Sequence, residues 1–347
     1  LGLKETPAIS MANEVTYNHP DAIEAWREIE EWIRATTVVR TLQYSKMGFL
    51  GHTYPGMLDM YSDFTMIQAQ TGMHVEILEM CDLEKLVNEV TNEEKVQKLQ
   101  EVKKMFVISE DSTADPLAKK PTEEQLDWSC TMAVAQEKMV KQFDLDALTY
   151  YYRGLNNNLQ HIQEGFILGH SLLTAQGIPC SGEGDMKTGI AMKICDILNV
   201  GGSFCEIVVG DFKDQTLLLG HDGPFHIAIS DGKPVLRGLG LFHGKSGSGI
   251  SVEATVKKGD ITTLGLTQTK DGKLKMIVSH GIATDGPVMR IGNTMTPVKF
   301  AMGLRAYMNK WFMEGPTHHC AMSIGNNVGL FEKVANLMGI EFQVICE

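Results

Sequence analysis

An acidic residue stands between two glycines in residues 181–188, which read SGEGDMKT. The residues that follow, 188–198, have the pattern of a helix. A buried carboxylate is costly unless a positive group meets it, and a divalent cation would be such a group. Glu183 has a second interpretation, because an acid near the positive end of a helix is also favourable. On residue types alone, the segment predicts a metal ligand or a helix cap.

Three further groups of residues downstream could surround the same ion as Glu183. They are Glu206 in the segment SFCE, His221 in GHDGP, and the pair His318-His319 in GPTHH. Two carboxylates with imidazole suit a hard or borderline divalent ion such as Mn²⁺, Mg²⁺ or Co²⁺. They do not suit a zinc site built from thiolates.

Each of these residues also has an ordinary structural interpretation. Glu206 follows strand-like sequence and could face solvent, whereas His221 lies among apolar residues, where a hydrogen-bonded core histidine is the commoner case. Adjacent histidines in a Gly-Pro loop have little structural use, so His318-His319 favours a site more strongly. Cys320 has no second cysteine nearby and is predicted to be core. The metal hypothesis therefore depends on the whole set.

A second motif resembles a nucleotide site and is rejected. Gly244-Lys245-Ser246 is similar to the end of a phosphate-binding P-loop, but that loop needs glycine at the position of Leu239. The surrounding sequence is typical of β-hairpins and offers no helix that could point at a phosphate.

Length and composition bound the class of protein. The 347 residues are 43% apolar and 21% charged, which is typical of a globular protein with more than one domain. The net charge of −12 argues against nucleic acid or an anionic membrane as a partner. We find no apolar run that could span a bilayer and no signal peptide. The seven cysteines include no CxxC pair, so we expect no disulfide framework and a cytoplasmic setting.

The amino-terminal half alternates helical and strand patterns. Helices are expected over 21–36, 82–107, 164–176 and 188–198, and strands over 38–44, 74–80 and 146–152. Thr122 and Gln125 fit a capping box that starts a helix ending near Phe143. This alternation predicts a parallel α/β sheet, in which the loops after the strands carry ligands. Glu183 lies in such a loop.

The pattern changes after Gly201-Gly202. From Thr216 to Lys299 the chain consists of short β segments between turns, and Asp271-Gly272 predicts a hairpin joining 261–268 to 274–280. We expect an antiparallel barrel or sandwich. Helices over 298–312 and 327–337 and a strand over 341–345 should complete the chain.

The segment GEGDMKT at 182–188 strongly resembles the metal-site motif of the L-arabinose isomerase family, which is related to the L-fucose isomerases. The segments SFCE, GH and GPTHH then follow in the order of that family, and the sequence AWRE at 25–28 is also similar. The ordered set is specific, and the resemblance covers nearly the whole chain. It implies a remnant of an amino-terminal α/β domain over 1–36, a central α/β domain over 37–200, and a carboxyl-terminal domain with an antiparallel β-barrel and flanking helices over 201–347.

The resemblance also implies roles for individual residues. The metal ligands would be Glu183, Glu206, His221 and His319. Both glutamates would also be the acid–base residues, and the metal would usually be Mn²⁺, with Co²⁺ or Mg²⁺ as alternatives. The residues expected near the substrate are His318, Asp222 and Met57. With Glu183 facing the ion, Asp185 becomes the candidate for the helix cap.

The chain departs from the family at two places. The loop GHTYPGM at 51–57 and the Asp222-Gly223-Pro224 that follows the metal histidine both differ from what arabinose isomerases have there. Most of the family's amino-terminal domain would precede Leu1. We expect a homo-oligomer, a hexamer or a tetramer, with active sites near the subunit interfaces, because in this family that domain walls the site of a neighbouring subunit.

The implied reaction is the interconversion of an aldose and a ketose, as from L-arabinose to L-ribulose, through a cis-enediol. The sequence does not choose between Glu183 and Glu206 as the base. The alternatives are an isomerase or epimerase acting on L-fucose, D-arabinose or D-galactose, a metal-dependent lyase of sugars or sugar acids, and a sugar-binding protein without turnover.

Overall fold

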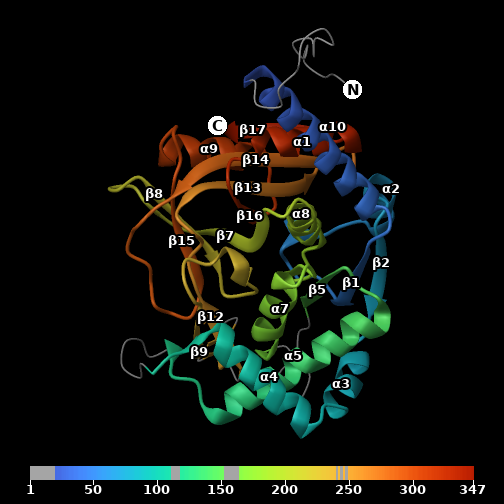
Figure 1. The fold of residues 1–347 in the computed structure, drawn as a ribbon, viewed down its shortest axis with the longest axis vertical. Coiled ribbons are helices and arrows are strands. Elements are labelled where there is room, and N and C mark those ends of the chain that lie inside the picture. The colour runs from blue at the N-terminus through green and yellow to red at the C-terminus, as the bar shows by residue number, and fades with distance from the viewer. Residues whose placement is uncertain (1–19, 111–117, 152–163, 240, 243–244, 247–248) are drawn as a thin grey trace.

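The computed structural model describes residues 20–110, 118–151, 164–239, 241–242, 245–246 and 249–347. Within these residues, a parallel sheet with helices stands beside a closed antiparallel barrel (Figure 1). The predicted α/β fold with a carboxyl-terminal barrel is therefore confirmed. Among the described helices, none is both long enough and apolar enough to cross a membrane. The first 19 residues of the segment expected over 1–36 lie outside the described part.

The parallel sheet has the strand order β2-β1-β5-β6. Its strands are β1 (Lys46–Gly51), β2 (His74–Leu78), β5 (Ala147–Tyr151) and β6 (Cys180–Ser181). All three pairings are parallel, and every residue of β5 is buried, as in a strand covered on both faces. The carboxyl ends of these strands meet at one edge of the sheet. The loop of residues 52–63, here called the β1–α2 loop, and the turn of residues 182–185 both leave from that edge.

Helices surround this sheet. They are α2 (Phe64–Thr71), α3 (Met80–Asn88), α4 (Asn92–Met105), α5 (Glu123–Phe143), α7 (Phe166–Ala175) and α8 (Met186–Ile197). The predicted capping box of α5 forms, since Thr122 and Gln125 exchange side-chain and backbone hydrogen bonds. Helix α8 packs against strands of both the parallel sheet and the barrel. It is therefore the element through which the two halves share a core.

Six strands close into the barrel in the order β13-β16-β7-β8-β15-β14, with β13 and β14 pairing to complete the ring. The strands are β7 (Gly201–Asp211), β8 (Thr216–His221), β13 (Gly259–Gln268), β14 (Leu274–Ala283), β15 (Thr294–Lys299) and β16 (His319–Ile324). Gln268 pairs with Leu274 across the Asp271-Gly272 turn, which confirms the predicted hairpin. The last strand, β17 (Glu341–Cys346), pairs in parallel with β14.

Two helices pack against the last strand of this sheet, β17. They are α9 (Leu304–Met313) and α10 (Val328–Met338). Both contact β17, and Figure 1 shows them together beside β14 and β17. A smaller sheet lies at the opposite end of the molecule in that view. It consists of β3 (Val107–Ile108), β4 (Ala118–Lys119), β9 (Val235–Leu239) and β12 (Ile250–Glu253). The hairpin β10 (Leu241–Phe242) with β11 (Lys245–Ser246) and the short helix η2 (Ile227–Ile229) complete the described elements of this region.

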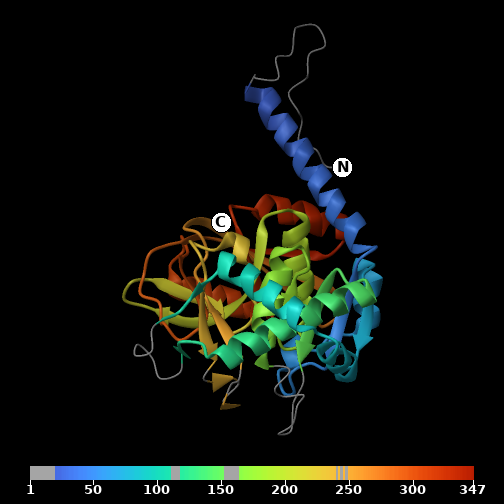
Figure 2. The same ribbon diagram turned by 60° about the horizontal axis from the view of Figure 1, so that its bottom comes forward.

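The helix expected over 82–107 is two helices, α3 and α4, because Thr91 starts α4 with a capping box of its own. Two other predictions of secondary structure were wrong. The strand expected over 38–44 belongs instead to α1 (Pro20–Leu42), which continues past the predicted end of the helix at Thr36. Ala35, Val38 and Leu42 recur at helical spacing and are fully buried in the core formed with α8 and α10, so tertiary packing overrides the strand preference of the valines. Figure 2 shows the other end of α1 extending away from the body of the molecule.

The other wrong prediction concerns the helix expected over 298–312. It begins only at Leu304, because the segment 294–299 pairs with β8 as a barrel strand. Gly303 then reverses the chain with a φ of 82°. The final helix and strand follow the prediction closely.

Candidate metal centre

The turn between β6 and α8 contains both acids of the GEGDMKT segment. Asp185 is the helix cap: its carboxylate accepts hydrogen bonds from the backbone N of Thr188 at 3.0 Å and from the Thr188 hydroxyl at 2.7 Å. This places Glu183 outside the capping position. Glu183 is buried and adopts a left-handed backbone with a φ of 62°, which is uncommon for a residue with a side chain and often marks a functional site.

Gly184 lets this turn lie directly against the β1–α2 loop. Its φ is 72°, and a Cβ at this position would lie 2.6 Å from the backbone oxygen of His52. A backbone hydrogen bond joins the two segments, since Tyr54 N donates to the carbonyl oxygen of Glu183 at 2.9 Å. A second one holds the turn to β5, since Gly184 N donates to the carbonyl oxygen of Tyr150 at 2.9 Å. The tight turn expected from the glycines therefore exists, and at Gly184 close backbone contact requires it.

The barrel supplies the other predicted ligands from three neighbouring strands. His319 begins β16 and is the direct partner of Glu206 in β7, so both side chains project from the same side of the sheet. His221 is the last residue of β8, the next strand in the barrel. Antiparallel pairing thus brings together Glu206 and His319, which are more than 100 positions apart in the chain.

The donor atoms converge on one small region. Nε2 of His319 lies 3.2 Å from Nε2 of His221 and 3.6 Å from Oε2 of Glu183. Nε2 of His221 lies 4.0 Å from Oε1 of Glu206. Ligand bonds of about 2.1 Å place neighbouring donors about 3 to 3.5 Å apart, so these separations are close to those of a coordination shell. The described residues also include Glu183, His318 and His319 as a trio whose donor atoms lie within 4.8 Å of one another.

Each histidine of the cluster has a carboxylate next to its Nδ1 atom. The pairs are His221 with Asp222 at 3.1 Å, His318 with Asp59 at 2.6 Å, and His319 with Asp185 at 3.0 Å. A carboxylate at Nδ1 favours the tautomer whose proton is on that atom, which leaves Nε2 as an electron-pair donor. The Nε2 atoms of all three rings are the ones that face the cluster. This arrangement is the usual one around metal-binding histidines.

Burial and charge support the same assignment. Burial lowers the pKa of His319, and the neighbouring rings of His221 and His318 lower it further against the opposing effect of Asp185. Burial opposes ionisation of Asp185 too, but its hydrogen bond with His319 and the charge of Lys187 hold the pKa of that carboxyl below its usual range. His319 is therefore neutral beside an ionised Asp185, which is the state that a metal ligand needs.

The pKa values of the other two histidines, His221 and His318, are raised instead of lowered. Burial alone would lower the pKa of His221, but Asp222 and the cluster carboxylates Glu183 and Glu206 raise it above its ordinary value. Burial likewise opposes the charge on His318, whereas Glu183 and Asp59 raise the pKa of His318 to about 9. Two facing Nε2 lone pairs, as in His319 and His221, repel unless a proton or a cation lies between them. The donor set therefore fits a divalent cation, which would compete with protons for these rings.

The structure places the remaining predicted residues as follows. His318 is one-third exposed, and its Nε2 lies 3.7 Å from Oε2 of Glu183. Asp222 contacts His221 as described, and Met57 lies two residues before Asp59 on the β1–α2 loop. Sequence reasoning did not find Asp59 or the contact of Asp185 with His319. For Asp59 the sequence holds no signal, because its partner is 259 residues away.

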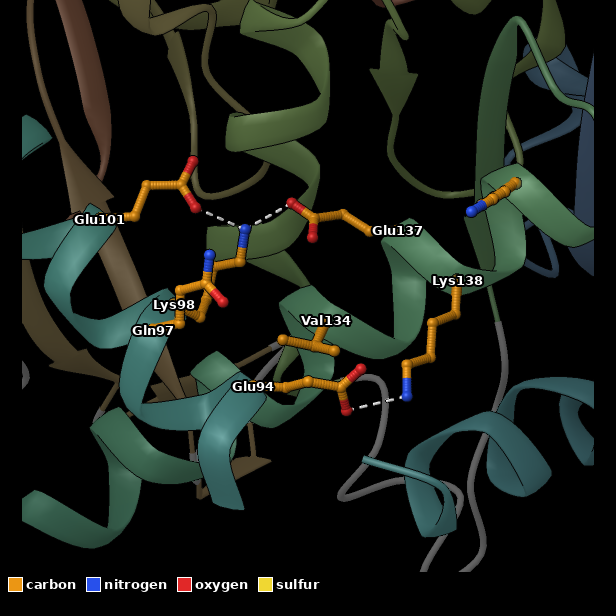
Figure 3. A pocket seen from close by; sticks show the side chains of 8 residues that line it. Glu94, Gln97, Lys98, Glu101, Val134, Glu137 and Lys138 are labelled. Carbon is orange, nitrogen blue, oxygen red and sulfur yellow. Dashed lines mark hydrogen bonds and ion pairs between the residues drawn. The ribbon is translucent and has the colours of Figure 1, made fainter. Parts of the chain in front are cut away.

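The surface also has a charged hollow that is separate from this cluster. About 290 Å³ in volume, it lies between α4 and α5 (Figure 3). Lys98 there contacts Glu101 at 2.6 Å and Glu137 at 2.5 Å, and Lys138 contacts Glu94 at 2.9 Å (Figure 3). Because these charges are paired with each other, we interpret the hollow as a surface contact between two helices.

Comparisons with known proteins show what the chain is similar to. The family model of the L-arabinose isomerase central domain matches residues 62–201. L-arabinose isomerase from Aeromonas salmonicida is 22% identical over 350 residues, which cover 98% of this chain and 68% of the relative. The enzyme from Vibrio parahaemolyticus is 23% identical and that from Nocardioides sp. is also 23% identical, each over 97% of this chain and 67% of the relative. The chain is similar to L-arabinose isomerases and contains a region that matches their central domain.

The family model matches only part of the chain that holds the candidate ligands. The matched residues 62–201 include Glu183 and Asp185, whereas the barrel donors Glu206, His221 and His319 lie beyond them. Those donors fall in the region covered by the full-length L-arabinose isomerase relatives. The resemblance stated from the motifs is thus confirmed, and the chain spans about two-thirds of the length of these isomerases.

Proposed function

We propose that this protein is a metal-dependent aldose–ketose isomerase that acts on an open-chain sugar. The observation that carries the proposal is the convergence of donor atoms from Glu183, His221 and His319, with the Glu206 carboxylate at the rim. The similarity of the chain to L-arabinose isomerases supports it. L-arabinose is the first substrate to test, because the relatives carry that name. Other pentoses and 6-deoxyhexoses follow, since the β1–α2 loop departs from the family pattern.

Glu183, Glu206, His221 and His319 would hold the ion, and Mn²⁺ is the first candidate, ahead of Co²⁺ and Mg²⁺. A carboxylate and imidazole donor set suits such ions. Bound there, the ion would supply Lewis-acid polarisation of the sugar carbonyl and a template for the adjacent hydroxyl. Asp185 keeps the Nδ1 proton of His319 directed away from the donor face, and the Asp222 carboxylate lies 3.1 Å from Nδ1 of His221.

The two glutamates differ in their access to a sugar. The Glu206 side chain is 36% exposed, whereas that of Glu183 is 8% exposed. We therefore propose that Glu206 removes the proton from C2 and returns it at C1, through a cis-enediol. Glu183, held by its buried turn, orients the donor face. His318, on the exposed side of Glu183, would donate to or accept from a sugar hydroxyl, with Asp222 and Met57 close to the same opening.

The experiment is an assay of the protein with Mn²⁺ against a panel of pentoses and 6-deoxyhexoses, with ketose formation as the readout. Glu206→Gln should lower kcat by about 10²- to 10⁴-fold, the usual contribution of a general base, and should weaken Mn²⁺ binding less than Glu183→Gln does. Glu183→Gln should instead weaken Mn²⁺ binding as well as turnover. If no sugar of the panel yields a ketose, the isomerase proposal is wrong. Sugar binding without turnover would then indicate a binding protein.

A cytoplasmic homo-oligomer with sites near subunit interfaces remains part of the proposal. Support comes from the family relationship and from the exposure of His318 and Glu206, whose outer faces are open to further contacts. Sedimentation of the protein with and without Mn²⁺ tests the oligomeric state, and a monomer under both conditions would contradict it.

A further inference from the structure

The β1–α2 loop is anchored to the motif helix α8 rather than only to its own ends. Lys187, in the first turn of α8, is almost fully buried. Its Nζ donates to the carbonyl oxygen of Tyr61 at 2.9 Å and to the Ser62 hydroxyl at 3.2 Å. Met60, just before them, is fully buried. The carboxyl-terminal part of the loop is therefore held in a fixed place beside the metal cluster.

Asp59 lies in this anchored part, on the short 3-10 helix η1 (Leu58–Met60). Its Oδ2 atom accepts two hydrogen bonds from one residue: the backbone N of His318 at 2.9 Å and the ring Nδ1 of His318 at 2.6 Å. Two bonds from one oxygen fix both the position and the rotation of the imidazole. The ring is then turned so that Nε2 lies 3.7 Å from Oε2 of Glu183.

The arrangement repeats that of Asp185 and His319, but on the exposed side of the cluster. His319 is fully buried, and its Nε2 faces two other donors. The His318 side chain is 33% exposed, and that of Asp59 is 39% exposed. A sugar approaching Glu183 from solvent would therefore meet the His318 ring, and the direction of Nε2 would decide which hydroxyl it contacts.

We propose that Asp59 is a positioning residue that orients His318 toward the hydroxyl groups of the bound sugar, an inference that rests on the proposed isomerase function. Asp59 acts through His318 and does not touch the reacting atoms. Because residues 51–57 of the loop that carries Asp59 differ from what arabinose isomerases have there, this contact is also where the loop can influence the choice of sugar.

A structural alternative is that Asp59 merely docks the loop onto β16. The two roles predict different couplings. If Asp59 acts by orienting the ring, removing it matters only while the ring is present. If it acts by docking the loop, its removal matters whether or not residue 318 has a side chain, because one of its two bonds is to the backbone N of His318. A double-mutant cycle separates these cases.

The test uses Asp59→Ala, Asp59→Asn, His318→Ala and the double variant Asp59→Ala/His318→Ala, each loaded with Mn²⁺ and assayed on the best sugar of the panel. Asp59→Ala should lower kcat/KM by about 10- to 100-fold, as for other partners that orient a ligand histidine, with Mn²⁺ affinity within about twofold of wild type. Asp59→Asn should recover most of that loss, because its amide oxygen can accept both hydrogen bonds. In the His318→Ala background, Asp59→Ala should add less than about twofold. Leu58→Ala, an exposed neighbour on the same short helix, is the matched control and should match wild type.

Additive effects of the two alanine variants would overturn the proposal, and so would wild-type kinetics for Asp59→Ala. A second readout does not depend on turnover. In ¹⁵N-histidine-labelled protein with Mg²⁺, the Nδ1 proton signal that disappears in His318→Ala should also disappear in Asp59→Ala and persist in Asp59→Asn. If no sugar is converted but this signal behaves as expected, the isomerase proposal fails while the orienting contact stands. If sugars are converted and the signal is unchanged in Asp59→Ala, the positioning role is wrong.

Discussion

Replacing Asp185 with asparagine should separate the two roles of this carboxylate, as helix cap and as partner of His319. One oxygen, Oδ1, accepts from the backbone N of Thr188 as the helix cap, and the other, Oδ2, accepts from His319 Nδ1 and the Thr188 hydroxyl. An asparagine that keeps its oxygen at the cap must present its NH₂ group to His319. The histidine can then meet it only by accepting at Nδ1, which moves its own proton to Nε2 and blocks the donor face.

The magnitude follows from the bonds that are lost. A hydrogen bond to a buried charged group contributes about 1.5–3 kcal/mol, and loss of a partner that orients a metal-binding histidine typically costs about 10- to 100-fold in affinity. At about 1.4 kcal/mol per tenfold, that affinity range corresponds to about 1.4–2.8 kcal/mol, so the two figures agree. We expect Asp185→Asn to weaken Mn²⁺ binding by about 10- to 100-fold. The cap itself should cost little, because asparagine caps helices about as well as aspartate.

The assay is isothermal titration with Mn²⁺, together with thermal unfolding in EDTA and in excess Mn²⁺. Asp63→Asn is the matched control, because Asp63 caps α2 through backbone bonds from Thr65 and Met66. The control should bind Mn²⁺ as wild type does. If Asp185→Asn also binds Mn²⁺ with wild-type affinity, the assignment of the His319 tautomer is wrong. If Asp185→Asn unfolds at a much lower temperature even in EDTA, the effect belongs to the cap and not to the histidine.

Three further predictions concern the buried surroundings of the site. Burial lowers the pKa of His170 to about 3, so the side chain stays neutral in the folded protein. In the unfolded chain the same side chain takes up a proton below about pH 6.5. The stability that this group contributes is therefore complete above that pH and falls by about 1.4 kcal/mol per pH unit toward pH 3. His170→Phe should remove about 2 kcal/mol of the difference in unfolding free energy between pH 7 and pH 5, and an unchanged difference in denaturant titrations would contradict this. Gly184→Ala should lower the free energy of unfolding by at least about 2 kcal/mol and should weaken Mn²⁺ binding. Gly56 also has a positive φ but has open space around it, so Gly56→Ala should lower the free energy of unfolding by less and leave Mn²⁺ binding unchanged. Lys187→Met should speed hydrogen exchange in the β1–α2 loop, while Lys193→Met, which removes a second buried lysine of α8, should leave that loop at the wild-type rate.

The sequence predicted the elements whose signals are local. The capping box of α5, the hairpin at Asp271-Gly272 and the alternation that gives a parallel sheet all depend on residues near one another in the chain. The extension of α1 through Val38 to Leu42 does not depend on local signals, because these residues are helical as a result of their burial against α8 and α10. The start of α9 was misplaced for a similar reason, since the barrel recruits residues up to Lys299 as a strand.

The site shows the same division. Residue types suggested the candidates, and the resemblance to the isomerase family selected Glu183, Glu206, His221 and His319. The structure brings these four side chains together, although their roles remain proposals. The hydrogen-bond partners of the histidines were mostly out of reach, because Asp59 and Asp185 lie 259 and 134 residues from the rings they contact. The role of Asp185 as a cap was predictable from its place before a helix. Its contact with His319 was not predictable, because only the folded barrel places that residue next to Asp185.

The pairing of β7 with β16 also separates two kinds of metal donor. Glu206 faces His319 on one rung of the ladder, and the next rung pairs Cys205 with Cys320, whose sulfur atoms lie 3.5 Å apart. Successive residues of a strand point to opposite faces, so both thiols belong to the apolar core on the other side of the sheet. Soft ligands that would attract copper or zinc thus stand one residue from the candidate centre and out of its reach. The alternation of the strand keeps thiolate ligands out of the candidate centre without any residue devoted to that task.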